Sequence, residues 1–383
     1  MDGSLIDPDW APLTMNEVRT LLSQFPTIGK PQEILTVSPR PFSAASLVST
    51  ENSKVFIKRH HTGVRDREGL LEEHRFLMYL HAHDAQVPRV FVAASGETAI
   101  ENGNWTYEVH ESSRGVDLYG DALSWTPFRT AAHAYSAGQA LARLHCAAQG
   151  FDAPRRKIQP LVASLTIFAA ECPEAALQDY LGMRPALSQS SAVRECAEEA
   201  IKQLAPFHSE LRPLLPSLAP LWTHNDLHAS NLLWSETGEK AQAISIIDFG
   251  LADRTNAVHD LSHAIERNIV EWLALVEDPA HPEKVPVHFD HLHALLNGYQ
   301  SVRPLSDHEA AALAPMTALC HAEFALSEAD YLLGILGSDQ KAAMAYDGWL
   351  VGHARWFRCA AGELLLDWLR SWSADRLPLR SKI

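Results

Sequence analysis

The chain has 383 residues, of which 46% are apolar and 21% are charged, and its formal net charge at pH 7 is −15. This length predicts two or three domains, or one fold with two lobes, and the apolar fraction is sufficient for a sizeable core. The negative charge disfavours binding to duplex nucleic acid, because such proteins need a basic face to neutralise phosphates. The short basic cluster Arg155-Arg156-Lys157 is interpreted as a solvated loop. An acidic surface suits a small or cationic substrate, although it can equally serve solubility alone.

The cysteine pattern indicates reduced thiols. The five cysteines are widely spaced and form no CxxC pair, which argues against a zinc site of that spacing and favours a cytoplasmic location. The first residues, Met1–Ser4, lack the basic segment and apolar run of a secretory signal. No uncharged apolar stretch approaches the roughly 18 residues that would span a membrane. The sequence therefore predicts a cytoplasmic protein without a membrane segment.

Most strand signals lie in the first 110 residues. Residues 47–50 and 54–58 flank a polar turn, which predicts a β-hairpin. A helix is predicted over 67–83, where apolar side chains recur at helical spacing. Two further strands are predicted over 88–93 and 105–110.

Helical patterns dominate the remainder of the chain. Helices are predicted over 128–149 and over 190–212, the second ending before two prolines. Residues 221–253 contain short strands and tight turns, and helical patterns continue from residue 258 to the end.

The change from strand to helix signals falls near residues 108–117. We therefore predict an α+β fold with two lobes. Residues 1–110 form a small β-rich N-terminal lobe of a mixed, five-stranded type, and residues 111–383 form a larger, mainly helical lobe.

The strongest local signal is the segment His224–Asn231, in which Asp226 is followed five residues later by Asn231. Asp248, in an Asp-Phe-Gly sequence, comes seventeen residues after Asn231 and follows the mostly apolar run 244–247. Phosphoryl transfer explains this set, because a carboxylate must orient the acceptor hydroxyl and take its proton. Magnesium prefers hard oxygen ligands, and one amide oxygen with one carboxylate suits it. Two carboxylates can also indicate a glycosidase, but that interpretation leaves Asn231 unexplained.

These motifs resemble the superfamily of aminoglycoside phosphotransferases, choline kinases and homoserine-kinase-like enzymes, which are relatives of the protein kinases. The family signature is His-x-Asp-x-x-x-x-Asn, followed by a strand and an Asp. The resemblance implies a two-lobed protein-kinase-like fold with ATP in the cleft. It also implies Asp226 as the catalytic base, with Asn231 and Asp248 as Mg²⁺ ligands. Family members usually have Gly where Asn225 stands, so this sequence departs from the pattern at a non-catalytic position.

The same resemblance assigns two charged residues in the first lobe. Lys58 ends a short strand with an apolar centre, and in the kinase fold such a lysine holds the ATP phosphates and pairs with a helix glutamate. Glu73 lies fifteen residues later in the predicted helix. Glu72 is the alternative, one residue earlier.

Two further segments are assigned to the nucleotide. Neither GxGxxG nor GxxxxGK[ST] occurs, which disfavours Rossmann and P-loop folds. Residues 40–46 correspond to the phosphate-covering loop, in which small residues admit backbone amides and Ser43 and Ser46 can add hydroxyl donors. The segment Tyr107–Glu111 resembles the hinge that binds the adenine edge. This assignment makes Glu108 and His110 candidate nucleotide-binding residues, with the role carried by the backbone.

The family resemblance also suggests structural roles. The segment Gly138–His145 resembles the family's core helix, whose role is to pack in the interior and not to take part in the chemistry. Asp260 resembles a second landmark after the Asp-Phe-Gly segment, and we expect it to anchor the catalytic loop by hydrogen bonds.

The acceptor is less well defined. Residues 298–306 resemble a segment of homoserine-kinase-like members, which favours an amino alcohol or a hydroxy amino acid such as homoserine. The alternative enzyme is an aminoglycoside kinase, whose acidic pocket could include Glu323 and Asp330, seven residues apart on one helix face. A different class is a nucleotide-binding pseudokinase without turnover, which the glycine-poor loop favours and the intact Asp226 disfavours. The sequence indicates no nucleic-acid partner and does not reveal an oligomeric state.

The 20 histidines show no recognised metal-ligand pattern. The adjacent pair His60-His61 is interpreted as a polar strand end. The remaining histidines are expected to be scattered surface or core residues.

Overall fold

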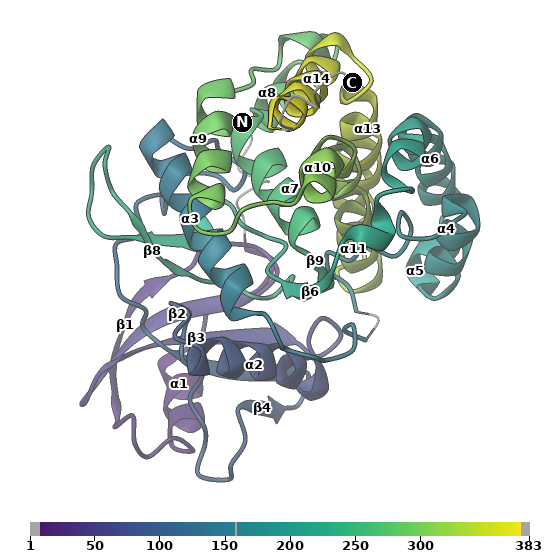
Figure 1. The fold of residues 1–383 in the computed structure, drawn as a ribbon. Coiled ribbons are helices and arrows are strands. Elements are labelled where there is room, and N and C mark those ends of the chain that lie inside the picture. Colours follow the sequence, from purple (N-terminus) through teal and green to yellow (C-terminus); the bar gives the residue numbers. More distant parts are fainter. Residues whose placement is uncertain (1–7, 158, 377–383) are drawn as a thin grey trace. The chain divides into compact units, whose positions relative to one another are not determined.

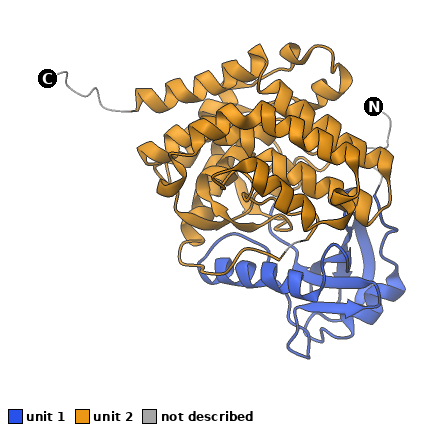
Figure 2. Ribbon diagram, turned by 90° about the vertical axis from the view of Figure 1, so that its right-hand side faces the viewer, with its two compact units in different colours: residues 1–115 blue, residues 116–383 orange. Residues whose placement is uncertain are grey.

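The computed structural model describes residues 8–157 and 159–376. The chain divides into two compact units between Gly115 and Val116, here called unit 1 and unit 2 (Figure 2). The sequence predicts this boundary five residues earlier, at residue 110. The segment Met1–Ser4, on which the prediction of no signal peptide rests, lies outside the described residues. Within the described ranges, no helix is long and apolar enough to cross a membrane.

Unit 1 is built on an antiparallel sheet. In its described part, five strands pair in the order β1-β2-β3-β5-β4. The strands are β1 (Pro31–Val37), β2 (Ala44–Thr50), β3 (Lys54–His61), β4 (Ala99–Asn102) and β5 (Trp105–Glu111), and the helices are α1 (Met15–Leu22) and α2 (Arg67–Ala82). The predicted hairpin and the predicted helix over 67–83 are confirmed as β2–β3 and α2.

The core of unit 1 lies between α1 and the sheet. Val18 and Leu22 of α1 belong to one buried cluster with Val55 and Ile57 of β3 and Val109 of β5. Alternate residues of β3 are buried, as expected for a strand with one face on a core. Lys58 therefore follows a strand centre that packing holds in place.

Two details of unit 1 differ from the prediction. Residues 88–93 do not form a strand, because the segment makes only one isolated bridge, from Val90 to His110. Beyond this bridge the segment leaves β5, because the Ala93 N–H donates to the Glu97 oxygen at 2.7 Å. The strand beside β5 is instead β4. Neither α1 nor β1 was predicted, since β1 exposes most of its residues and carries little apolar alternation.

Unit 2 is mainly helical, as predicted (Figure 1). Its α-helices are α3 (Ala131–Ala147), α4 (Pro173–Gly182), α5 (Pro185–Ser188), α6 (Ser191–Leu211), α7 (Ala257–Ile269), α8 (Trp272–Glu277), α9 (Phe289–Gln300), α10 (Asp307–Leu319), α11 (His321–Gly334), α12 (Asp339–Ala343), α13 (Gly352–Trp356) and α14 (Ala360–Asp375). The predicted helices over 128–149 and 190–212 correspond to α3 and α6.

Helices α3 and α9 cross at very short range. A Cβ atom on Gly298 would lie 1.9 Å from the backbone oxygen of Tyr135, and one on Gly138 would lie 2.1 Å from that of Leu295. Glycine at both positions lets the two backbones touch. This contact fixes α9, and with it Tyr299, against α3.

Two short antiparallel strand pairs frame the site region of unit 2. Strand β6 (Pro220–Thr223) pairs with β9 (Asp253–Asn256), and β7 (Leu232–Trp234) pairs with β8 (Ala243–Ile246). The predicted motif residues lie in the loops between these strands. The pairing brings the segments around Asp226 and Asp248 onto one framework.

Candidate active site

The loop between β6 and β7 carries the motif that begins at His224. Asn225 in this loop has φ +61°, a left-handed conformation that Gly adopts freely and that Asn tolerates better than most residues. Its buried side-chain oxygen accepts hydrogen bonds from Thr223 Oγ1 at 2.9 Å and Thr255 Oγ1 at 3.2 Å. The departure from the usual Gly therefore preserves the backbone conformation and adds contacts.

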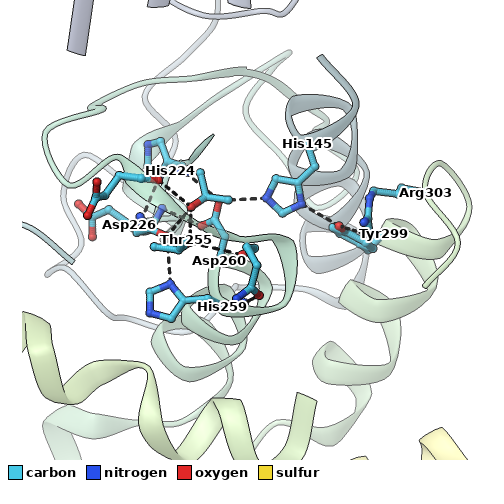
Figure 3. Close-up of polar contacts among 12 residues, drawn as sticks. His145, His224, Asp226, Thr255, His259, Asp260, Tyr299 and Arg303 are labelled. Atoms are coloured by element: carbon cyan, nitrogen blue, oxygen red, sulfur yellow. Dashed lines mark hydrogen bonds and ion pairs between the residues drawn. The ribbon is translucent and has the colours of Figure 1, made fainter. Parts of the chain in front are cut away.

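Asp260, in the first turn of α7, anchors this loop. Its carboxylate accepts hydrogen bonds from the backbone N–H groups of His224 and Asn225, each at 2.8 Å, and from His145 Nε2 at 3.0 Å (Figure 3). Burial alone would raise the pKa of Asp260, but the bonds from His145 and the His224 amide outweigh burial and hold the pKa at about 2. Asp260 is thus an ionised carboxylate in the expected anchoring position.

The anchor extends to two other helices. His145 of α3 binds Asp260 through Nε2 and contacts Tyr299 Oη of α9 through Nδ1 at 2.7 Å (Figure 3). The Tyr299 hydroxyl in turn accepts from Arg303 at 3.1 Å. Because His145 donates to a carboxylate, its Nδ1 is free to accept from Tyr299. The segment that resembled homoserine-kinase-like enzymes therefore has, through Tyr299, a supporting role.

Asp226 lies in the loop between β6 and β7 with its side chain 18% exposed. One carboxylate oxygen, Oδ1, forms an ion pair with Arg267 Nη1. The other, Oδ2, accepts from Asn231 Nδ2 at 3.0 Å, and the same nitrogen donates to the Asp226 backbone oxygen at 2.9 Å. Two side chains thus fix the carboxylate while part of it stays accessible.

Arg267 of α7 is fully buried, and this burial lowers its pKa to about 10. It therefore carries a positive charge at neutral pH. Its partner Asp226 reaches the surface, so the pair places a buried cation directly behind a partly exposed carboxylate.

His224 connects the loop to the segment of Asp248. Its Nδ1 accepts the Asp226 N–H at 3.1 Å, and its Nε2 donates to the backbone oxygen of Ile247 at 2.9 Å. Burial lowers the pKa of His224, which is consistent with the single neutral tautomer that these two bonds require. The ring also packs edge-on against Phe249.

Asp248 follows β8 with φ +63°, a conformation that is costly for a residue with a side chain and is common at functional sites. The side-chain nitrogen of Asn231 donates to Asp226. The side-chain oxygen of Asn231 therefore points away from these bonds. The Ile247 N–H donates to the Asn231 backbone oxygen at 2.9 Å. The two predicted Mg²⁺ ligands thus sit on directly bonded segments, and both offer the hard oxygen that Mg²⁺ prefers.

The predicted nucleotide residues of unit 1 occupy the expected elements. Lys58 of β3 pairs with Ala45 of β2 and with Glu108 of β5. Glu73 lies on α2 and is buried, and Ser43 lies in the turn before β2, after Phe42 with φ +71°.

The predicted hinge, Tyr107–Glu111, needs a correction, because it lies within β5. The Val109 oxygen accepts from the N–H of Phe91 at 2.8 Å, and the Glu111 N–H donates to the oxygen of Arg89 at 2.8 Å. These backbone groups are therefore already bonded. The boundary of unit 1 falls after this segment, at Gly115.

Glu108 and His110 belong to a buried network. The Glu108 carboxylate is 2.7 Å from His110 Nε2, 2.8 Å from His74 Nε2 and 3.0 Å from His60 Nε2. Burial would raise the pKa of Glu108, but these histidines, His110 foremost, hold it well below its usual range. The network occupies both side chains, which does not favour their assignment to the nucleotide.

The acidic pocket of the alternative interpretation, an aminoglycoside kinase with Glu323 and Asp330, is not supported for Glu323. Its buried carboxylate accepts hydrogen bonds from the Thr166 backbone N–H, from Thr166 Oγ1 at 2.7 Å and from the Ile167 N–H at 2.6 Å. Asp330 lies 3.7 Å from Arg184 and lines a separate open pocket of about 670 Å³. Although Glu323 and Asp330 lie on one face of α11, their surroundings differ.

Sequence reasoning missed Arg267, His145 and Tyr299. Arg267 had one usable signal, because it lies seven residues after Asp260 and a helix places such residues on one face. No local signal pointed to His145 or Tyr299, since their roles depend on how three helices pack.

The sequence profile described as the Phosphotransferase enzyme family matches residues 40–305, well over half of the chain. The chain belongs to this family. The match includes both loops of the site and Lys58. No curated protein matches the chain.

Solved structures of similar fold support this assignment. An aminoglycoside phosphotransferase from Alicyclobacillus acidocaldarius subsp. acidocaldarius is 16% identical, with a TM-score of 0.55 over 96% of this chain and 98% of its own. An amicoumacin kinase in complex with AMP-PNP, Ca²⁺ and Ami is 16% identical, with a TM-score of 0.53 over 94% and 93%. A microcompartment-associated aminopropanol kinase is 18% identical, with a TM-score of 0.53 over 90% and 98%. The chain thus has the predicted protein-kinase-like α+β fold.

Proposed function

We propose that this phosphotransferase moves the γ-phosphoryl group of ATP to a hydroxyl of a small molecule. The observation that carries the proposal is the arrangement of Asp226. Its carboxylate is fixed by Asn231 and Arg267, lies in a loop anchored by Asp260, and remains partly accessible. A carboxylate held in this way can orient a hydroxyl and accept its proton.

Asn231 and Asp248 would hold Mg²⁺, since each offers an oxygen ligand and their segments are hydrogen-bonded to each other. When bound, Mg²⁺ would neutralise charge on the ATP phosphates. The similar amicoumacin kinase was solved with AMP-PNP and Ca²⁺, which supports a nucleotide and a divalent ion for this chain.

In unit 1, Lys58 would contact the phosphates with its ammonium group, Glu73 would orient Lys58, and Ser43 would lie in the loop that covers the phosphates. The adenine-binding role would move from Glu108 and His110 to residues 113–115, which follow Ser112, whose N–H donates to the oxygen of Lys54 at 3.3 Å. The backbone of this segment, and not its side chains, would bind the adenine edge.

The acceptor is proposed to be a small amine with a hydroxyl group, such as an amino alcohol. Two of the similar structures are named as kinases of aminopropanol and amicoumacin, and the net charge of −15 favours a cationic substrate. Homoserine stays a candidate, although Tyr299, in the segment that suggested it, supports the anchor. An aminoglycoside is the alternative, but Glu323 is engaged elsewhere.

A panel of acceptors tests this proposal. The full chain is incubated with ATP and Mg²⁺ and with amino alcohols, hydroxy amino acids, sugars and aminoglycosides, and products are identified by mass spectrometry. The proposal predicts one added phosphoryl group on an amino alcohol or hydroxy amino acid. Tight ATP binding with no product from any class would instead favour the pseudokinase interpretation.

A further inference from the structure

A second polar cluster lies behind the candidate active site, at the meeting of three helices. Glu266 belongs to α7, His321 begins α11 and His353 belongs to α13. All three side chains are at most 3% exposed. The residues are far apart in the sequence, so no spacing motif marks them.

The carboxylate oxygens and imidazole nitrogens of this cluster lie close together but form no hydrogen bonds with one another. Glu266 Oε1 lies 3.4 Å from His321 Nδ1 and 3.3 Å from His353 Nδ1. The three ligand atoms lie within 4.8 Å of one another. Among the described residues, neither carboxylate oxygen of Glu266 and no ring nitrogen of either histidine has a hydrogen-bond partner. Buried polar groups are costly when left unpaired.

The Glu108 network of unit 1 provides an internal comparison. There the carboxylate oxygens lie 2.7, 2.8 and 3.0 Å from the histidine nitrogens, which are ordinary hydrogen-bond lengths. The same residue types in unit 2 are held several tenths of an ångström farther apart. Their separation therefore requires an explanation other than a carboxylate–imidazole hydrogen bond.

We propose that Glu266, His321 and His353 bind one divalent transition-metal ion of the Zn²⁺ class. Zinc binds histidine nitrogen and carboxylate oxygen at about 2.0–2.2 Å in a tetrahedral arrangement, which sets neighbouring ligand atoms about 3.3–3.5 Å apart. The two separations from Glu266 Oε1, 3.3 Å to His353 Nδ1 and 3.4 Å to His321 Nδ1, match this edge length.

The ligand chemistry distinguishes this site from the proposed Mg²⁺ site. Two imidazoles and one carboxylate suit zinc, whereas Mg²⁺ prefers oxygen ligands alone. His263 and Cys320 form a separate convergent group with Glu266.

Aromatic packing sets the orientation of the two rings. Trp272 stacks on His353 with ring centroids 3.6 Å apart, and Trp125 meets His321 edge-on at 5.5 Å. Glu266 Oε2 lies 3.8 Å from Arg267 Nε, and Arg267 pairs with Asp226. The metal would thus fix α7, α11 and α13 behind the candidate base and act as a positioning element.

Metal content and coordination test the proposal on the full chain, independently of any kinase activity. The purified protein is stripped with a chelator, incubated with Zn²⁺ or Co²⁺, dialysed and analysed for bound metal. We expect about one ion per chain, a rise of several degrees in Tm, and X-ray absorption that shows two imidazoles per zinc. A stripped protein that retains less than about 0.1 ion per chain after this incubation, or zinc without imidazole ligands, would overturn the proposal.

Variants exclude adventitious binding by other histidines. His353→Ala should lose the bound ion and the Tm rise. His288→Ala, which alters the more exposed group of His288, Asp290 and His291, should keep both, and so should His74→Gln in the Glu108 network. Retention of the ion by folded His353→Ala would refute the assignment. If that variant does not fold, the X-ray absorption spectrum of the wild type tests the assignment, because it shows whether imidazoles bind the zinc.

Discussion

Arg267, fully buried in α7, forms an ion pair with the partly exposed carboxylate of Asp226. The pair joins the loop between β6 and β7 to the helix that also carries the anchor Asp260. It means that Asp226 has two roles, as the proposed base and as the counter-ion of a buried cation. Removing its charge should therefore affect both turnover and folding.

Asp226→Asn should reduce turnover by about 10² to 10⁴, the usual contribution of a general base. It should also lower the free energy of unfolding by about 1 to 3 kcal/mol, because the buried Arg267 loses a charged partner. Urea unfolding and steady-state kinetics measure the two effects. A variant as stable as the wild type would show that the ion pair contributes nothing.

The double variant Asp226→Asn with Arg267→Met separates these roles. Methionine fills the space of the guanidinium stem without a charge, so part of the lost stability should return. Turnover should stay as low as in the single variant. Recovery of turnover would show that the Asp226 carboxylate is not the base.

Asp260→Asn should destabilise the protein by about 2 kcal/mol at pH 7, which corresponds to the pKa change from 3.8 to about 2. The folded pKa lies below the unfolded one, so this stability is present above about pH 4 and is lost as the pH falls toward 2. The difference between variant and wild type should shrink over that interval. A difference that does not depend on pH would contradict the assigned ionisation.

Asp248→Asn should slow turnover by about 100-fold or more, since a catalytic metal stabilises the transition state by several kcal/mol. It should also raise the Mg²⁺ concentration needed for half-maximal rate. Titration of the rate with Mg²⁺ measures this effect. The same change at an exposed position, Asp339→Asn, is the matched control and should leave both values unaltered. An Asp248→Asn protein with the Mg²⁺ dependence of the wild type would remove Asp248 from the metal site.

Lys58→Ala should weaken ATP binding by about 10- to 100-fold, the equivalent of one charge-assisted hydrogen bond. Lys54→Ala, at the exposed start of the same strand, should leave the affinity unchanged. Calorimetric titration with ATP and Mg²⁺ compares the two variants. Equal affinities would remove Lys58 from the nucleotide site.

The sequence indicated the parts of this protein whose structure depends on local spacing. The interval between Asp226 and Asn231 is short enough for one loop to bring them together, and Lys58 lies in the strand that its apolar neighbours predicted. The apolar run after Pro88 looked equally like a strand, but tertiary pairing selected β4 instead.

Long-range packing accounts for what the sequence did not show. Arg267 contacts Asp226 from 41 residues away, and His145 and Tyr299 meet across 154 residues. Glu323 and Asp330 share a helix face, yet a loop at Thr166 covers only the first of them. The Glu266 cluster combines three helices, so no motif search would find it.

Transfer of radiolabel from [γ-³²P]ATP tests the central claim most directly. Wild type and Asp226→Asn are compared at equal concentrations of folded protein, with Mg²⁺ and the best acceptor of the panel. The account predicts label in the hydroxyl phosphoester with wild type, dependence on Mg²⁺, and a rate at least about 100-fold lower with Asp226→Asn. Equal rates for the two proteins, or label released only as inorganic phosphate with every acceptor, would contradict it.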